Sequence, residues 1–201
     1  MKPTEALGWK HGFPGPGPVP ADLAVICCVR NAADWARSMH AKPWHTPPAM
    51  QRMEFGEFIR APWETIYDRA RYFGGAEHLV GLPLAADRDP ETGEVFADLF
   101  ALRRAKLTGL LSYLGRGCAC VVLRMEEAQK APEQTVDRIL AALGQPPRSA
   151  PFRPVNKRLG SRFKPAVESR PATPARLGAE DLAYLRKRLN MQEEAALGYS
   201  Y

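Results

Sequence analysis

An arginine and a serine near the N-terminus have types and spacing suited to binding an anion. The apolar stretch Leu23–Val29 leads into Arg30 and Asn31, and Ser38 follows eight residues after the arginine. If the stretch is a strand and Asn31 caps a helix, Arg30 and Ser38 both lie near the carboxyl end of that strand. A guanidinium, a neutral donor and a helix N-terminus together suit a monophosphate group. The spacing also allows a simple salt bridge for Arg30 and a solvated Ser38.

A basic segment in the last third of the chain is a second candidate for anion binding. It holds one acid, Glu168, and seven basic residues: Arg148, Arg153, Lys157, Arg158, Arg162, Lys164 and Arg170. Such a local positive field implies an anionic partner, although it is also compatible with a solvated face. The interleaved aromatic residues are only Phe152 and Phe163, so we expect no nucleic acid partner.

Strands that alternate with helices are expected to position these side chains. Apolar runs predict a short strand over 6–10, a strand buried on both faces over 23–29 and a second buried strand over 118–123. Amphipathic patterns and caps predict helices from Asn31 to before Pro43 and over 54–60, 62–72, 98–114, 132–143 and 180–196. The alternation predicts an α/β fold with a mostly parallel sheet flanked by helices. Ligands of such sheets bind beyond the carboxyl ends of the strands, where Arg30 and Arg124 are expected.

Four motifs follow one another along the chain. They are Lys10-His11-Gly12-Phe13-Pro14, Arg30-Asn31-Ala32-Ala33-Asp34 with Ser38, Arg124-Met125-Glu126-Glu127-Ala128 after an apolar run, and Asn156-Lys157-Arg158-Leu159-Gly160. In this order they resemble the sulfotransferases that use 3′-phosphoadenosine 5′-phosphosulfate (PAPS). Members of that family show Lys-Thr-His-Leu-Pro, Arg-Asn-Pro-x-Asp with a following serine, Arg-Tyr-Glu-Asp-Leu and an Arg-Lys-Gly loop. Ala32 and Met125 replace the proline and the tyrosine of the family pattern.

The resemblance implies a fold and a role for each matched residue. It implies one sulfotransferase-like domain over residues 1–201, built as a three-layer, P-loop-like sandwich. His11 would be the general base that takes the proton of an acceptor hydroxyl or amine, and Lys10 would stabilise charge on the bridging oxygen. The 3′-phosphate of the co-substrate PAPS would be held by Arg30, Ser38, Lys157, Arg158 and Gly160. The implied acceptor is a small molecule or a glycan.

One element of the family pattern does not occur in this sequence. The family binds the 5′-phosphosulfate with a Pro-Lys/Arg-Ser-Gly-Thr-type turn dozens of residues before the Lys-His motif, whereas only nine residues precede Lys10. We therefore expect this sequence to be an N-terminally shortened version of an enzyme. The enzyme would be active if the missing loop is supplied. The alternatives are a non-catalytic nucleotide- or partner-binding module of the same fold and, less favoured, a nucleic-acid-binding protein that uses residues 148–170.

Composition narrows the class of protein further. A length of 201 residues with 45% hydrophobic and 25% charged residues is typical of one soluble globular domain. No apolar run approaches the ~20 residues that span a bilayer, and no secretory signal is recognisable, so we expect a cytoplasmic protein without a membrane partner. Cys27, Cys28, Cys118 and Cys120 are expected to be small buried side chains. No histidines or cysteines have metal-ligand spacing, so no metal is expected.

Overall fold

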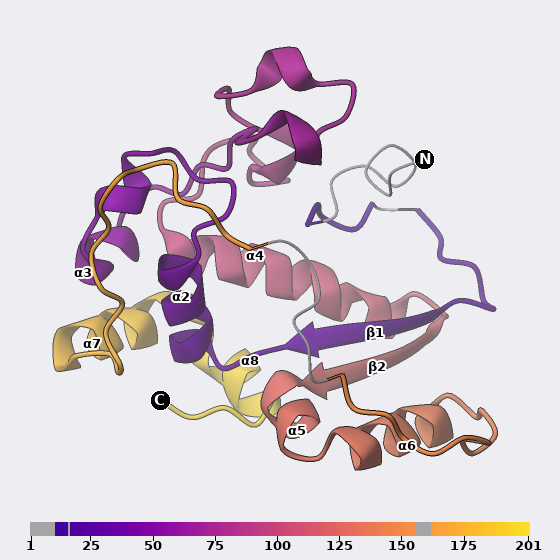
Figure 1. Cartoon of the computed structure of the whole chain (residues 1–201). Helices are drawn as coiled ribbons and strands as arrows, with labels where there is room; N and C mark the ends of the chain where they lie inside the picture. The colour runs from indigo at the N-terminus through magenta and orange to yellow at the C-terminus, as the bar shows by residue number, and fades with distance from the viewer. Residues whose placement is uncertain (1–10, 16, 156–161) are drawn as a thin grey trace. The chain divides into compact units, whose positions relative to one another are not determined.

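The computed structural model describes residues 11–15, 17–155 and 162–201 of the chain (Figure 1). These residues form two compact units, each assembled from segments distant in sequence. The sheet unit comprises Gly15–Asn31 and Leu107–Arg162. The helical unit comprises Ala32–Lys106 and Phe163–Tyr201, together with the stretch that ends at Pro14. The strand expected over 6–10 lies outside the described residues.

The sheet unit contains two parallel strands, β1 (Ala24–Val29) and β2 (Ala119–Arg124), drawn as neighbouring arrows in Figure 1. Two helices of this unit, α5 (Met125–Lys130) and α6 (Pro132–Ala142), follow β2. Pro132 begins α6 in the first turn, where the missing amide hydrogen costs nothing, as expected. The expectation of a mixed α/β fold with parallel strands and flanking helices is therefore confirmed, and α5 is an element that was not predicted.

The expectation that the first strand is buried on both faces is wrong, and so is the expectation of a buried second strand, because Ala119 is exposed and the other residues of β2 are half-buried. Cys27 and Val29 are buried, but the alternate residues Ala24, Ile26 and Cys28 are exposed, with Ile26 at 49%. Side chains of a strand alternate between two faces, and packing covers only one face of β1. On the covered face the Cys27 thiol lies 3.2 Å from the carbonyl oxygen of Leu110. The expectation of four buried cysteines is met only at Cys27: Cys28 is exposed, and Cys118 and Cys120 are half-buried.

The helical unit is built around an apolar core. Its helices are α2 (Ala32–Ala41), α3 (Phe55–Phe58), most of α4 (Leu99–Leu111), α7 (Ala179–Arg188) and α8 (Met191–Ala196). Short 3₁₀ segments occur at Met50–Arg52, Ala70–Tyr72, Glu77–Leu79 and Ala85–Asp87, and another, Ser112–Gly115, extends α4 within the sheet unit. The most deeply buried core side chains include Phe58, Ile59, Leu99, Phe100 and Leu185, each 0% exposed. The predicted helices around 32–42 and 98–114 are thus confirmed.

Two other helix predictions are wrong, for different reasons. Residues 62–69 form no helix and Ala70–Tyr72 is only a 3₁₀ turn. The backbone amides of Trp63 and Ile66 instead donate to the carbonyl oxygens of Phe96 and His45, each at 2.8 Å. The helix expected over 180–196 is divided into α7 and α8. Asn190 separates the two, and its side chain accepts a hydrogen bond from the amide of Glu193 (3.2 Å), which caps a new helix start.

Among the described residues, no helix has the length and apolar character needed to cross a membrane.

Candidate functional site

Two arginines lie at the carboxyl edge of the sheet, as the sequence predicts. The parallel register pairs Val29 of β1 with Arg124 of β2, and Arg30 directly follows Val29. Both guanidinium-bearing residues are half-buried. The amide of Asn31 donates to Glu126 Oε1 (2.8 Å), which ties the end of β1 to the first turn of α5. The edge therefore combines cationic side chains with a backbone turn held in place by a carboxylate.

The remaining residues assigned to the 3′-phosphate are distributed over the chain. Ser38 lies in α2, where it is half-buried, and α2 begins at Ala32 as the strand–turn–helix prediction requires. Ser38 belongs to the helical unit and Arg30 to the sheet unit, so their joint action on one anion stays a prediction. Four further predicted residues lie outside the described part of the chain: Lys10, Lys157, Arg158 and Gly160.

His11 is exposed and its backbone is held by a lysine from α4. The Lys106 ammonium donates to the His11 carbonyl oxygen and forms an ion pair with Asp87. The same ammonium lies 3.8 Å from the centroid of the Phe13 ring. Burial lowers the pKa of Lys106, while the charge of Asp87 opposes that effect.

The carboxylate that holds Lys106 is itself anchored in the core. Asp87 is 5% exposed, and its Oδ2 accepts a hydrogen bond of 2.5 Å from the Thr65 hydroxyl. The indole nitrogen of Trp63, which belongs to the core, donates to the same Thr65 oxygen at 3.1 Å. A chain of polar contacts thus connects the core to the backbone of His11. No sequence signal indicates it, because its members are far apart and Lys106 lies within a helix of mixed polarity.

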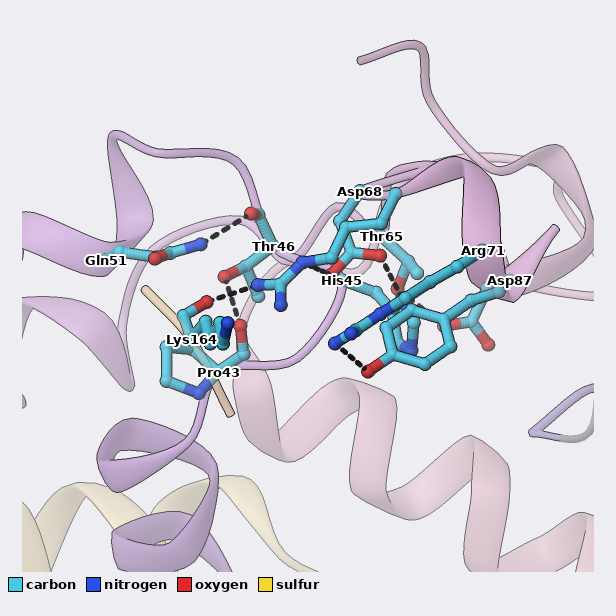
Figure 2. Close-up of polar contacts among 11 residues, drawn as sticks. Pro43, His45, Thr46, Gln51, Thr65, Asp68, Arg71, Asp87 and Lys164 are labelled. Atoms are coloured by element: carbon cyan, nitrogen blue, oxygen red, sulfur yellow. Dashed lines mark hydrogen bonds and ion pairs between the residues drawn. The ribbon is translucent and has the colours of Figure 1, made fainter. Parts of the chain in front are cut away.

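A buried histidine and aspartate form a second polar cluster (Figure 2). His45 Nδ1 lies 2.8 Å from Asp68 Oδ1, with the two side chains 6% and 9% exposed. The backbone of His45 has a φ of 58°, in the left-handed region that non-glycine residues rarely adopt. The rings of Tyr72 and Phe73 meet the imidazole edge to face, at 5.7 and 5.4 Å between centroids. This enclosed pair fixes the loop of His45 against the segment of Asp68.

The basic segment of residues 148–170 is not a uniform cationic surface. Arg148 donates to Glu133 (2.7 Å) and Asp137 (2.6 Å), which balance its charge. Arg170 donates to the carbonyl oxygens of His40, Ala41 and Gln51, and so serves to join segments of the helical unit. Among the described residues of this segment, the exposed basic residues are Arg153, Arg162 and Lys164.

A surface pocket of about 520 Å³ lies beside Arg170 in the helical unit. Its lining is Arg52, Glu54, Glu168, Ser169, Arg170 and Pro171. Two cations and two carboxylates balance each other there, so the pocket has no net charge to attract a phosphate. Within the described ranges, no group of three or more His, Cys, Asp or Glu side chains could hold a metal ion.

Comparisons with known proteins return no relative of this chain. No protein-family model, no curated protein and no solved structure matches it. Function must therefore be inferred from the chain's own residues.

Proposed function

We propose that this protein has the sulfotransferase fold and binds the 3′-phosphate of PAPS, or of its product 3′,5′-diphosphoadenosine, at the carboxyl edge of β1 and β2. The observation that carries the proposal is the parallel register, which brings Arg30 and Arg124 to one edge. Parallel α/β sheets bind their ligands at this edge. The full fold would be a three-layer sandwich with a larger parallel sheet, in a single domain over residues 1–201.

The proposed site binds phosphate by charge and by hydrogen bonds. Arg30 would present a planar fork to two phosphate oxygens, and Ser38 would supply a neutral donor from α2. Lys157, Arg158 and Gly160 would complete the site, as the resemblance to the family implies. Each charge-assisted hydrogen bond contributes about 1.5–3 kcal/mol, so the loss of Arg30 alone is expected to weaken binding strongly.

In the catalytic form of the proposal, the acceptor oxygen or nitrogen attacks the sulfur of PAPS. The new bond to sulfur forms while the bond between sulfur and the bridging phosphate oxygen breaks. The acceptor proton moves to the imidazole of His11, and 3′,5′-diphosphoadenosine leaves with its charge stabilised by Lys10. The exposure of His11 is compatible with access by an acceptor, for which we propose a small molecule or a glycan.

A second candidate is a nucleotide-binding module of the same fold without turnover. The sequence feature that favours it is the lack of a Pro-Lys/Arg-Ser-Gly-Thr-type turn in these 201 residues. The two candidates share nucleotide binding and differ in whether 3′,5′-diphosphoadenosine is released from PAPS.

Thermal unfolding with and without nucleotide tests the shared step. A ligand at 100 times its dissociation constant stabilises the native state by about 2.7 kcal/mol, which raises Tm by roughly 5–10 °C for a chain of this size. We expect this shift with 3′,5′-diphosphoadenosine, not with adenosine 5′-monophosphate, and not in Arg30→Gln. The matched control is Arg104→Gln, which changes an exposed arginine of α4 and should keep the full shift. The same shift with both nucleotides, or none with either, would refute the proposal.

A further inference from the structure

We propose that Lys106 is the positioning residue for the general base: it fixes the backbone of His11 and so sets where the imidazole meets the acceptor. This inference rests on the proposed function, because the role of His11 as base does.

The contacts of Lys106 converge on the segment that carries His11. Its ammonium binds the His11 carbonyl oxygen and lies over the Phe13 ring, so it touches the chain on both sides of Gly12. These contacts restrain a stretch that is otherwise exposed at His11 and half-buried at Phe13. The attraction between a cation and the face of an aromatic ring adds to the hydrogen bond.

The position of the ammonium is itself determined by rigid surroundings. Lys106 belongs to α4, whose neighbouring residues Leu102 and Leu107 are 4% and 5% exposed. From the other side, the buried carboxylate of Asp87 holds the ammonium, and the Thr65 hydroxyl holds that carboxylate. The His11 backbone is therefore connected to the core through a lysine with few alternative positions.

The ion pair with the buried Asp87 accounts for a cation at this position, because an apolar side chain would leave that carboxylate unpaired. Asp87 alone does not account for the approach of the same ammonium to the His11 carbonyl oxygen and the Phe13 ring. What the ammonium adds is a directional bond to the backbone of His11. A displacement of about 1 Å at a reacting group can lower the rate about 10²-fold, so such a bond matters for proton transfer.

The test compares Lys106→Met, which keeps the length of the side chain, with Lys106→Arg, which keeps the charge. Arg104→Met on the same helix is the matched control. In protein labelled with ¹⁵N-histidine, four backbone amides report local order, because the chain has four histidines. We expect the His11 order parameter to fall from about 0.8 to below about 0.6 in Lys106→Met, to recover in Lys106→Arg, and to stay unchanged in the control. The buried His40 serves as an internal reference and should not change.

Kinetics separate positioning from stability. With PAPS and 4-nitrophenol as acceptor, we expect kcat of Lys106→Met to fall about 10–100-fold with an unchanged KM for PAPS, and to recover partly in Lys106→Arg. If Lys106→Met fails to fold because Asp87 is left unpaired, Lys106→Met with Asp87→Asn replaces it in both measurements.

The outcomes distinguish this inference from the proposed function. An unchanged His11 order parameter in Lys106→Met, or an unchanged kcat, overturns the positioning role. A wild-type chain that binds 3′,5′-diphosphoadenosine but releases none from PAPS also overturns that role, while nucleotide binding stands. A wild-type chain that binds no nucleotide overturns the proposed function itself.

Discussion

Removal of the Glu194 carboxylate is expected to be among the most destabilising single changes in the helical unit. Its two oxygens accept hydrogen bonds from Arg103 at 2.8 and 2.9 Å, and the two side chains are 1% and 7% exposed. The hydroxyl of Tyr201 donates to the same carboxylate (2.7 Å) and accepts from the amide of Ala32 (2.8 Å). Burial raises the pKa of Tyr201, so its hydroxyl remains a donor. Glu194 therefore connects α8 to α4 and to the first residue of α2, the helix that carries Ser38.

The magnitude follows from burial. Glu194→Met leaves the Arg103 guanidinium buried without its carboxylate, which costs about 3–5 kcal/mol. A domain with a stability of about 5–15 kcal/mol loses a large share of it. In the double variant with Arg103→Met, neither charge remains, so we expect it to be more stable than Glu194→Met by about 2 kcal/mol or more. The double variant also loses the contact between Arg103 and the Trp35 ring, which limits this recovery.

Urea denaturation of the four members of this double-mutant cycle at pH 7 measures the coupling. The matched control is the pair Arg88–Glu64, which has a similar distance of 2.9 Å but side chains that are each 33% exposed. Solvent screens that pair, so its cycle should give about 0–1 kcal/mol. Equal coupling in the two cycles, or a cost below about 1 kcal/mol for Glu194→Met, would show that burial does not set the strength of these pairs.

Two further predictions concern a histidine and a pair of thiols. Nε2 of His40 donates to the Met53 carbonyl (3.0 Å), Nδ1 accepts from the Thr173 hydroxyl (2.7 Å), and burial lowers the pKa of this ring. The unfolded chain then binds more protons, so the free energy of unfolding should fall as the pH drops below about 6.5, by at most about 1.4 kcal/mol per pH unit. Urea titrations from pH 7.5 to 5 check this, and His40→Gln should reduce the slope; an equal slope in the variant would exclude His40 as its source. Burial raises the pKa of both thiols, that of Cys27 to about 12, but only Cys28 is exposed, so a disulfide reagent should modify Cys28 in the native protein and Cys27 only after unfolding. Peptide mapping measures both rates, and early modification of Cys27 would contradict the burial of that face of β1.

The elements nearest to Arg30 could be predicted because local pattern and tertiary structure agree there. The apolar run that ends at Val29 forms β1 almost to the residue, and α2 begins directly after Asn31. The predicted second strand also corresponds to β2. The parallel pairing of the two strands alone therefore places Arg30 and Arg124 at one edge of the sheet. What the pattern could not show is that one face of β1 is exposed, because a continuous apolar run does not report which face is covered.

The segment around Trp63 could not be predicted because its partners are distant in sequence. Residues 62–72 have apolar side chains at helical spacing, yet the amides of Trp63 and Ile66 bond to Phe96 and His45. The same holds for the contacts of Lys106, whose partners Asp87 and His11 are 19 and 95 residues away. Local secondary-structure propensity carries no information on such long-range pairs, and tertiary contacts override the propensity where the two disagree.

The charge balance at the sheet edge determines what else a phosphate site there would need. Arg124 lies 3.6 Å from Glu127, and the carboxylate of Glu126 binds the amide of Asn31, so acids accompany the arginines at this edge. A phosphate monoester, which is dianionic near neutral pH, needs a surplus of positive charge to bind in water. Under the proposed function, that surplus has to come from the basic residues Lys157 and Arg158 acting together with Arg30. Binding of 3′,5′-diphosphoadenosine should then depend on both parts of the chain at once, and neither Arg30 nor the pair Lys157 and Arg158 alone would suffice.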